Sequence, residues 1–289
     1  MTPAAFVPQA LPVRADDGHA SELLACIPEV PRASLLWLPA LGVAARHYLP
    51  FAEALAARGV AVFVHEWRGH GSSSVRATRD CDWNYRTLLC TDLPAAEAAI
   101  ATRVPGLARI VGGHSLGGQL ACCRLALSPL TASHLWLVAS GAPWWRAFPA
   151  PRRYVLPLVY RFLPWLAARR GALPGRTIGF GGNEARGLIA DWARTGLSGR
   201  YAAAGLDIDL EARLREVDVD VTAVVMTEDW LGPESSLRFL LAKLASGHLA
   251  QVTTLDANAL GTRADHFAWM RTPGAVADVL GASLEPRGD

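Results

Sequence analysis

The chain has 289 residues, of which 51% are hydrophobic and 19% are charged, and its formal net charge is +2. This length suits one large domain with room for an insertion, and the low charge content excludes a disordered chain. The basic residues are scattered rather than clustered, so we expect no nucleic-acid partner. No uninterrupted apolar run approaches the roughly 20 residues that cross a bilayer, so we expect no integral membrane segment.

The N-terminal sequence and the cysteines favour a cytoplasmic protein. Residues 1–15 contain no basic segment followed by a long apolar run, and therefore do not resemble a secretory signal. The five cysteines are an odd number, and Cys122 and Cys123 are adjacent in a predicted helix, where their side chains point in different directions. We expect all five to be reduced, as in the cytoplasm.

Short apolar runs that predict strands alternate along the chain with segments that predict helices. The expected strands are residues 21–27, 34–38, 60–64, 109–111, 135–139, 219–226 and 249–255. The expected helices are residues 46–58, 92–103, 120–127, 233–244 and 272–280. Several of these strands are continuously apolar, which is typical of parallel strands that helices cover on both faces. The pattern predicts an α/β fold with a doubly wound, mostly parallel sheet.

One segment interrupts this alternation. Residues 143–214 contain no convincing strand and many prolines, glycines, tryptophans and arginines. We predict that residues 143–214 form an inserted, mostly helical cap, or lid, over the carboxyl edge of the sheet, where ligands bind in such folds. Residues 1–142 and 215–289 then form the core.

The most informative motif is Gly113-His114-Ser115-Leu116-Gly117, which follows an apolar strand and opens an apolar helix. In that context G-x-S-x-G forms a nucleophile elbow, which holds the serine in a strained backbone conformation. The glycines leave room for the tight turn. Because short motifs also occur by chance, the assignment of Ser115 as a nucleophile needs a base, an acid and an oxyanion site elsewhere.

Candidates for the base and the acid follow the serine in the expected order. A serine hydroxyl is a weak nucleophile until a base takes its proton, and in this fold class the order is Ser, then Asp or Glu, then His. His266 follows the last expected strand, and Asp229 follows the one before it. We predict that Ser115 is the nucleophile, His266 the base and Asp229 the carboxylate that orients the imidazole. Glu228 and Asp256 stay open as alternatives for the acid.

An oxyanion hole requires two backbone amides. The amide of Leu116, directly after the serine, is one candidate. The other is the amide of Leu41 in the loop Pro39-Ala40-Leu41-Gly42, which follows an earlier strand. The alternative for this loop is an ordinary tight connection between a strand and a helix.

The histidines do not predict a metal site. His47, His65, His70 and His114 have a spacing that matches no ligand motif, and the cysteines do not join them in a recognisable pattern. We therefore expect neither a metal nor a cofactor.

These features together resemble the α/β-hydrolase fold superfamily, closest to its serine-hydrolase branch of esterases, lipases and S33-type peptidases. The resemblance covers about residues 35–280, except the cap. It rests on Gly113-His114-Ser115-Leu116-Gly117-Gly118, Glu66-Trp67-Arg68-Gly69-His70-Gly71-Ser72-Ser73, Asp229 with Pro233, and His266. Members usually carry His-Gly where this chain has Pro39-Ala40, but Leu41 supplies a backbone amide whatever its neighbours.

The insertion suggests the nature of the substrate. Trp144, Trp145 and Phe148 follow the strand that ends at Ala139, and they either line an apolar acyl pocket or form the packing core of the lid. The segment is also basic, which favours solvation of the outer face of the lid, with contact to an anionic membrane surface as a weaker alternative.

The sequence thus predicts a serine hydrolase that cleaves carboxylic esters of a small apolar acyl substrate through an acyl-enzyme. Thioesters and amides are substrate variants, since the same groups cleave them. A cofactorless lyase or a haloperoxidase-like enzyme on the same fold is an alternative, because a fold does not fix chemistry. A non-catalytic ligand receptor is another alternative, although the intact Ser115, Asp229 and His266 argue against it.

Overall fold

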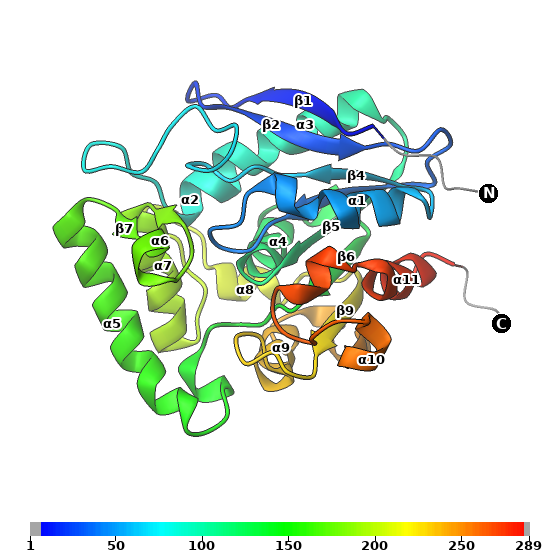
Figure 1. Ribbon diagram of the computed structural model, residues 1–289. Helices are drawn as coiled ribbons and strands as arrows, with labels where there is room; N and C mark the ends of the chain where they lie inside the picture. Colours follow the sequence, from blue (N-terminus) through cyan, green and yellow to red (C-terminus); the bar gives the residue numbers. More distant parts are fainter. Residues whose placement is uncertain (1–6, 286–289) are drawn as a thin grey trace.

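A computed structural model describes residues 7–285 of the chain (Figure 1). Eight strands form one sheet in the order β1-β2-β4-β3-β5-β6-β9-β10. Their bounds are β1 (Gln9–Arg14), β2 (Ala20–Cys26), β3 (Ala33–Leu38), β4 (Val60–Val64), β5 (Ala108–His114), β6 (His134–Val138), β9 (Asp220–Met226) and β10 (Gln251–Leu255). The strands from β4 across to β10 are parallel to one another, whereas β1 and β2 are antiparallel at one edge.

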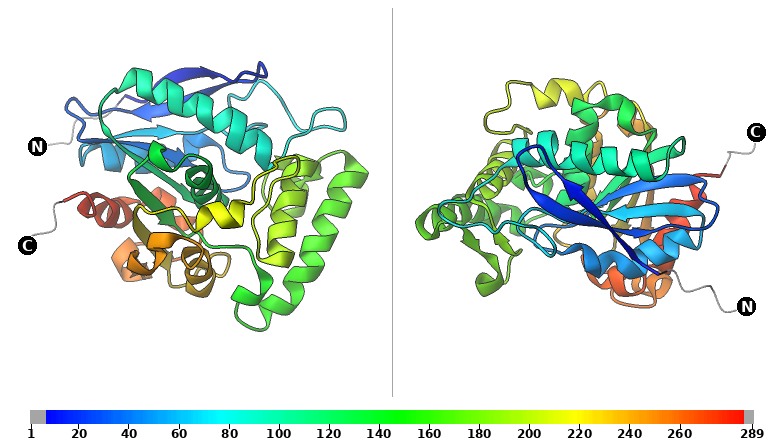
Figure 2. Two further views of the ribbon diagram at one scale, coloured as in Figure 1. Left: turned by 180° about the vertical axis from the view of Figure 1, so that it is seen from behind. Right: turned by 90° about the horizontal axis from the view of Figure 1, so that it is seen from above.

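Helices cover both faces of this sheet (Figure 2). Strands β3 and β4 are buried at every position, because their side chains, apolar except for Ser34, pack against helices on both sides. Helices α1 (Leu49–Ala56) and α11 (Gly274–Ala282) pack on one face, while α3 (Leu93–Arg103) and α4 (Leu116–Leu127) pack on the other. The predicted doubly wound, mostly parallel α/β fold is confirmed.

The structure differs from the sequence prediction mainly at the sheet edges and at the ends of helices. Strand β1 was not expected, because it contains a proline and is largely exposed, and both features are tolerated only at a sheet edge. The expected helix at residues 46–58 begins as a 3₁₀ turn (Ala45–Tyr48) before α1. Outside the segment between β6 and β9, the structure also contains the short helices α2 (Tyr85–Thr87), α9 (Glu234–Leu241) and α10 (Ala257–Leu260).

The segment between β6 and β9 contains the predicted insertion. It carries helices α5 (Arg152–Arg170), α6 (Gly175–Ile178), α7 (Arg186–Ser198) and α8 (Leu210–Leu214). Contrary to the expectation of no strand, the two-residue strands β7 (Leu173–Pro174) and β8 (Asn183–Glu184) pair antiparallel.

Helices α5 and α7 pack against each other at one side of the molecule, with a small apolar cluster between them (Figure 1). Helix α8 instead packs on α4 of the main body. The division into a core of residues 1–142 and 215–289 and a cap of residues 143–214 remains our proposal.

Candidate active site

A strained turn joins β5 to α4 and places Ser115 at the carboxyl end of a central strand. Ser115 has φ 54° and ψ −119°, a conformation that residues with a side chain rarely adopt. A Cβ atom at Gly113 would lie 2.3 Å from the carbonyl carbon of Gly117, and one at Gly117 would lie 1.9 Å from the carbonyl oxygen of Leu38. Because these positions accept only glycine, the G-x-S-x-G pattern follows from the geometry of the turn.

A buried carboxylate and imidazole lie beyond the ends of the next strands. His266 Nδ1 and Asp229 Oδ2 are 2.7 Å apart, with side chains that are 7% and 0% exposed. The other oxygen, Asp229 Oδ1, accepts hydrogen bonds from the amides of Leu231 and Gly232 at 2.8 and 2.9 Å. The carboxylate is thereby fixed and accepts a hydrogen bond from the Nδ1–H group of His266, so the lone pair on Nε2 is free to accept a proton.

The other two candidate acids lie elsewhere. Asp256 caps the short helix α10, where its side chain accepts a hydrogen bond from the amide of Ala259. Glu228 has an exposed side chain. Of the three carboxylates that the sequence offered, Asp229 is the one in contact with His266.

His266 lies against the residue that precedes the serine in the elbow. Its ring centroid is 4.7 Å from that of His114, the residue that precedes Ser115. Within residues 7–285 no hydrogen bond joins the Ser115 hydroxyl to His266. Such bonds are often long before a substrate is bound. Burial, together with the neighbouring His266, holds the pKa of His114 well below its ordinary value, so His114 is neutral.

The candidate oxyanion loop, residues 39–42, is anchored at its first two residues. Trp67 Nε1 donates to the carbonyl oxygen of Pro39 at 2.9 Å. The amide of Ala40 donates to the hydroxyl of Tyr48 at 2.8 Å, and that hydroxyl is 2.9 Å from His114 Nδ1. Since Nδ1 of the neutral imidazole can accept a hydrogen bond, we infer that the Tyr48 hydroxyl donates to it.

The backbone amides of Leu41 and Leu116, which we assign to the oxyanion hole, donate no hydrogen bond among the described residues. Leu116 is the first residue of α4, where a helix has free amides and a positive dipole end. The close approach of Gly117 to Leu38 brings this helix end against the start of the candidate oxyanion loop.

A very small cavity of about 10 Å³ adjoins these two leucines. The other side chains that line it are the charged Arg68 and Glu184 and the apolar Trp67, Trp83, Leu88 and Leu188, none of which the sequence analysis assigned to a pocket. Trp67 belongs to the Glu66–Ser73 motif, which carries the resemblance to the α/β-hydrolases but to which no substrate contact was assigned. Trp83 and Leu188 lie far apart along the chain and are brought together only by the fold.

Part of the insertion closes over this cavity. A Cβ atom at Gly42 would lie 2.2 Å from the backbone nitrogen of Gly182, so the two segments touch. A carboxylate oxygen of Glu184 lies 3.2 Å from Nε2 of His70, and both side chains are buried. Glu184 also accepts a hydrogen bond from the amide of Gly182. This contact joins the β7–β8 hairpin to the body of the protein next to the candidate oxyanion loop.

The three aromatic residues predicted to bind substrate lie in other surroundings. Trp144 stacks on Phe239 of α9, with ring centroids 4.4 Å apart, and Trp145 lies under the guanidinium of Arg146. Phe148 is buried. None of these three aromatic residues lines the cavity beside Leu41 and Leu116. Their role in a substrate pocket stays a prediction.

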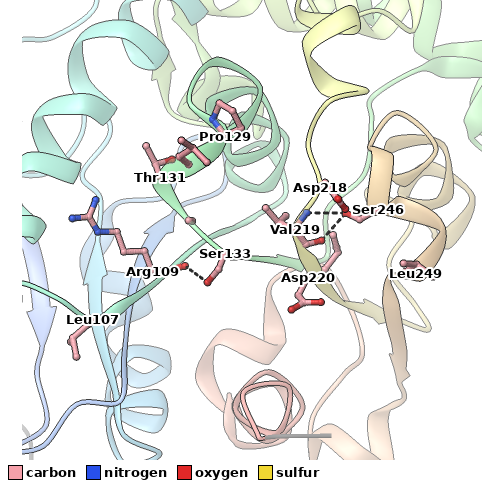
Figure 3. Close-up of a pocket in the computed structure, with 13 residues that line it drawn as sticks. Leu107, Arg109, Pro129, Thr131, Ser133, Asp218, Val219, Asp220, Ser246 and Leu249 are labelled. Carbon is pink, nitrogen blue, oxygen red and sulfur yellow. Dashed lines mark hydrogen bonds between the residues drawn. The ribbon is translucent and has the colours of Figure 1, made fainter.

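Two other hollows differ in their relation to the site. One of about 340 Å³ is lined by His266, Trp230 and Phe267, so it adjoins the candidate base. Another, of about 650 Å³, lies at the amino ends of β5, β6 and β9 (Figure 3). Arg109, Ser133 and Asp220 line it, at the edge of the sheet opposite Ser115. The volume of this larger hollow therefore does not identify the active site.

The described residues show no arrangement that would hold a metal. Within residues 7–285 no group of three or more His, Cys, Asp or Glu side chains is suitably placed.

Comparisons with known proteins agree with this architecture. The esterase domain of a Rhodothermus marinus protein is 16% identical, with a TM-score of 0.61 over 96% of this chain and 98% of that one. A hydrolase from Pseudomonas aeruginosa PA01 is 21% identical, with a TM-score of 0.59 over 96% and 98%. A membrane phospholipase A, described as a bacterial virulence factor, is 18% identical, with a TM-score of 0.62 over 96% and 86%.

Sequence comparison identifies the family. No curated protein sequence matches the chain. The model of the family described as serine aminopeptidase, S33, matches residues 29–189, which include the candidate oxyanion loop and the elbow. This match covers more than half of the chain. The chain belongs to the serine aminopeptidase S33 family and is an α/β-hydrolase enzyme.

Proposed function

We propose that this hydrolase cleaves carboxylic esters through an acyl-enzyme formed on Ser115. The observation that carries the proposal is the buried 2.7 Å contact between His266 and Asp229, together with the packing of His266 on His114, which precedes a serine held at positive φ. This arrangement leaves one imidazole nitrogen free for the serine proton. The similarity in fold to an esterase domain supports an ester as the bond that is cleaved.

The reaction would proceed in two halves. His266 Nε2 takes the proton as Ser115 Oγ attacks the substrate carbonyl carbon, and the carbonyl oxygen becomes an oxyanion that accepts hydrogen bonds from the amides of Leu41 and Leu116. The ester C–O bond then breaks, and His266 returns the proton to the departing alcohol. A water molecule, deprotonated by His266, attacks the acyl-enzyme in the same way and releases the acid.

The cavity volume points to a small acyl group. A volume of about 10 Å³ beside Leu41 and Leu116 holds about one water molecule. Even a short acyl chain therefore needs some rearrangement of the lining, and a longer one requires the β7–β8 hairpin to move away from the candidate oxyanion loop. Thioesters and amides are substrate variants that use the same groups.

The five free cysteines support a reducing, cytoplasmic setting.

The test is the hydrolysis of p-nitrophenyl esters of increasing chain length by Ser115→Ala, His266→Ala and the double variant. We expect each single change to lower kcat by about 10⁴-fold or more, and the double variant to be little worse, because the two groups act as a unit. His248→Ala is the matched control, since His248 is exposed and not part of the site. Near-normal turnover by folded Ser115→Ala would overturn the proposal.

A further inference from the structure

Helix α5 exposes a continuous apolar stripe. Tyr154, Leu158 and Phe162 follow one another at intervals of four residues, and Trp165 continues the row, so they share one face of the helix. Their exposed fractions lie between 52% and 68%, and Val155 beside them is 57% exposed. Large exposed apolar patches of this kind usually mark a site of interaction.

This stripe is not the face by which α5 packs on the protein. The buried positions of the helix are Tyr160, Leu163 and Ala167. At 100° per residue they lie on the side opposite the exposed row. The helix is therefore apolar on two sides, although packing within the chain accounts for only one of them.

The charges around the stripe are all positive. Residues 143–183 contain no acidic residue and seven arginines, namely Arg146, Arg152, Arg153, Arg161, Arg169, Arg170 and Arg176. Within residues 7–285 none of these guanidinium groups forms an ion pair. Three of them lie over exposed rings instead, Arg169 over Trp165, Arg153 over Tyr154 and Arg152 over Trp230. These unpaired cations favour an anionic partner.

Helix α5 is also placed to meet a large flat partner. It lies at the outer side of the molecule, beyond α6 and α7, in Figure 1 and in the left view of Figure 2. Its 19 residues span about 28 Å at about 1.5 Å per residue. Within the described residues no helix is long and apolar enough to cross a membrane.

We propose that the outer face of α5 docks on the surface of an anionic lipid bilayer. Arginines together with Trp, Phe and Leu side chains characterise helices that lie in the membrane interface. A second copy of the chain fits less well, because symmetric pairing of α5 would bring unpaired arginines against unpaired arginines. The lipid surface supplies both the negative charge and the apolar phase.

Vesicle partitioning of the full-length protein tests this proposal. We expect the protein to sediment with vesicles made of equal parts phosphatidylcholine and phosphatidylglycerol, to bind vesicles of phosphatidylcholine alone much less, and to dissociate at high salt. Each arginine near the surface contributes about fivefold, so replacing Arg161, Arg169 and Arg170 with Gln should lower the partition coefficient about a hundredfold. Replacing Leu158, Phe162 and Trp165 with Gln should lower it at least about tenfold.

The matched control replaces Leu130 and Leu249 with Gln. These leucines are 98% and 68% exposed and line the hollow of Figure 3, away from α5. The control should partition like the wild type, and all variants should keep the wild-type melting temperature and their hydrolysis of a soluble ester. A blue shift of Trp165 emission on vesicles, taken as the difference from Trp165→Phe, would further support insertion of the stripe.

Three results would overturn the proposal. The first is the absence of partitioning to anionic vesicles, and the second is equal partitioning to both kinds of vesicle. The third is a concentration-dependent dimer in sedimentation velocity that the change of Leu158, Phe162 and Trp165 abolishes, without any binding to vesicles. That last result would assign the stripe to a second copy of the chain.

Discussion

Removal of the Tyr48 hydroxyl should weaken both the fold and the candidate oxyanion loop. That hydroxyl has two buried partners, the amide of Ala40 and Nδ1 of His114. In Tyr48→Phe both lose their hydrogen bond and no water can replace it. Each orphaned group costs about 1–3 kcal/mol, so the free energy of unfolding should fall by about 2–6 kcal/mol. At about 2.1 cal/mol/K per residue over this chain, the melting temperature should fall by about 3–10 °C.

The effect on catalysis follows from the neighbouring amide. Ala40 immediately precedes Leu41, whose amide we assign to the oxyanion hole, and loss of one such donor costs about 10²–10³ in kcat. Trp67 still holds Pro39 in the variant, so the loop is loosened rather than lost. We expect kcat to fall about tenfold to a hundredfold and KM to change little, because the interaction is made with the oxyanion of the transition state.

The assay compares ester hydrolysis and thermal unfolding of Tyr48→Phe with those of Tyr85→Phe. The Tyr85 hydroxyl is equally buried but has no hydrogen-bond partner among the described residues. Its removal should therefore leave kcat and melting temperature at or above the wild-type values. A lower melting temperature with unchanged kcat in Tyr48→Phe would refute the positioning role, and two variants that behave alike would refute the hydrogen-bond argument itself.

Further outcomes are expected at the acid, the lid and the buried histidines. Asp229→Asn should lower kcat by several orders of magnitude through the wrong imidazole tautomer, while Glu228→Gln should not; the reverse would identify Glu228 as the acid. Trp144→Ala should change the ratio of rates on short and medium esters if this side chain lines an acyl pocket, and should lower only the melting temperature if it packs on α9. Burial lowers the pKa of His65 to about 4 and that of His114 well below its ordinary value, so both stay neutral when folded. In the unfolded chain both histidines become protonated below about pH 6.5. The free energy of unfolding should therefore be at its maximum above that pH, and should fall by about 1.4 kcal/mol per pH unit for each histidine as the pH drops to 5. A free energy of unfolding, measured with urea, that does not change between about pH 6.5 and pH 5 would contradict this last expectation.

The sequence predicts what depends on chain order and strand ends. Ser115, Asp229 and His266 each follow an apolar strand, and parallel strands end at one edge, so a place at the same edge of the sheet could be expected for all three without coordinates. The edge strand β1 was missed because its proline and exposed side chains weaken the pattern. Both outcomes have the same cause, since buried central strands carry a strong apolar signal and edge strands do not.

Contacts between distant segments could not be predicted in this way. Tyr48 reaches the candidate oxyanion loop because a 3₁₀ turn, rather than a regular helix, places its hydroxyl under Ala40. The contact of Gly42 with Gly182 closes the cavity, yet it joins two loops whose sequences show no relation to each other. The size of the candidate pocket therefore depends on packing between the insertion and the body, which local sequence patterns do not encode.

The covalent role of Ser115 is tested most directly by a fluorophosphonate probe, with mass spectrometry of the intact protein and of its peptides. The account predicts one adduct per chain, located on Ser115 and formed in step with the loss of ester hydrolysis. Ser115→Ala should form no adduct, and His266→Ala should form it far more slowly because the serine then lacks its base. An active enzyme that loses its activity through an adduct on another residue, or that stays fully active with Ser115 modified, would contradict the account.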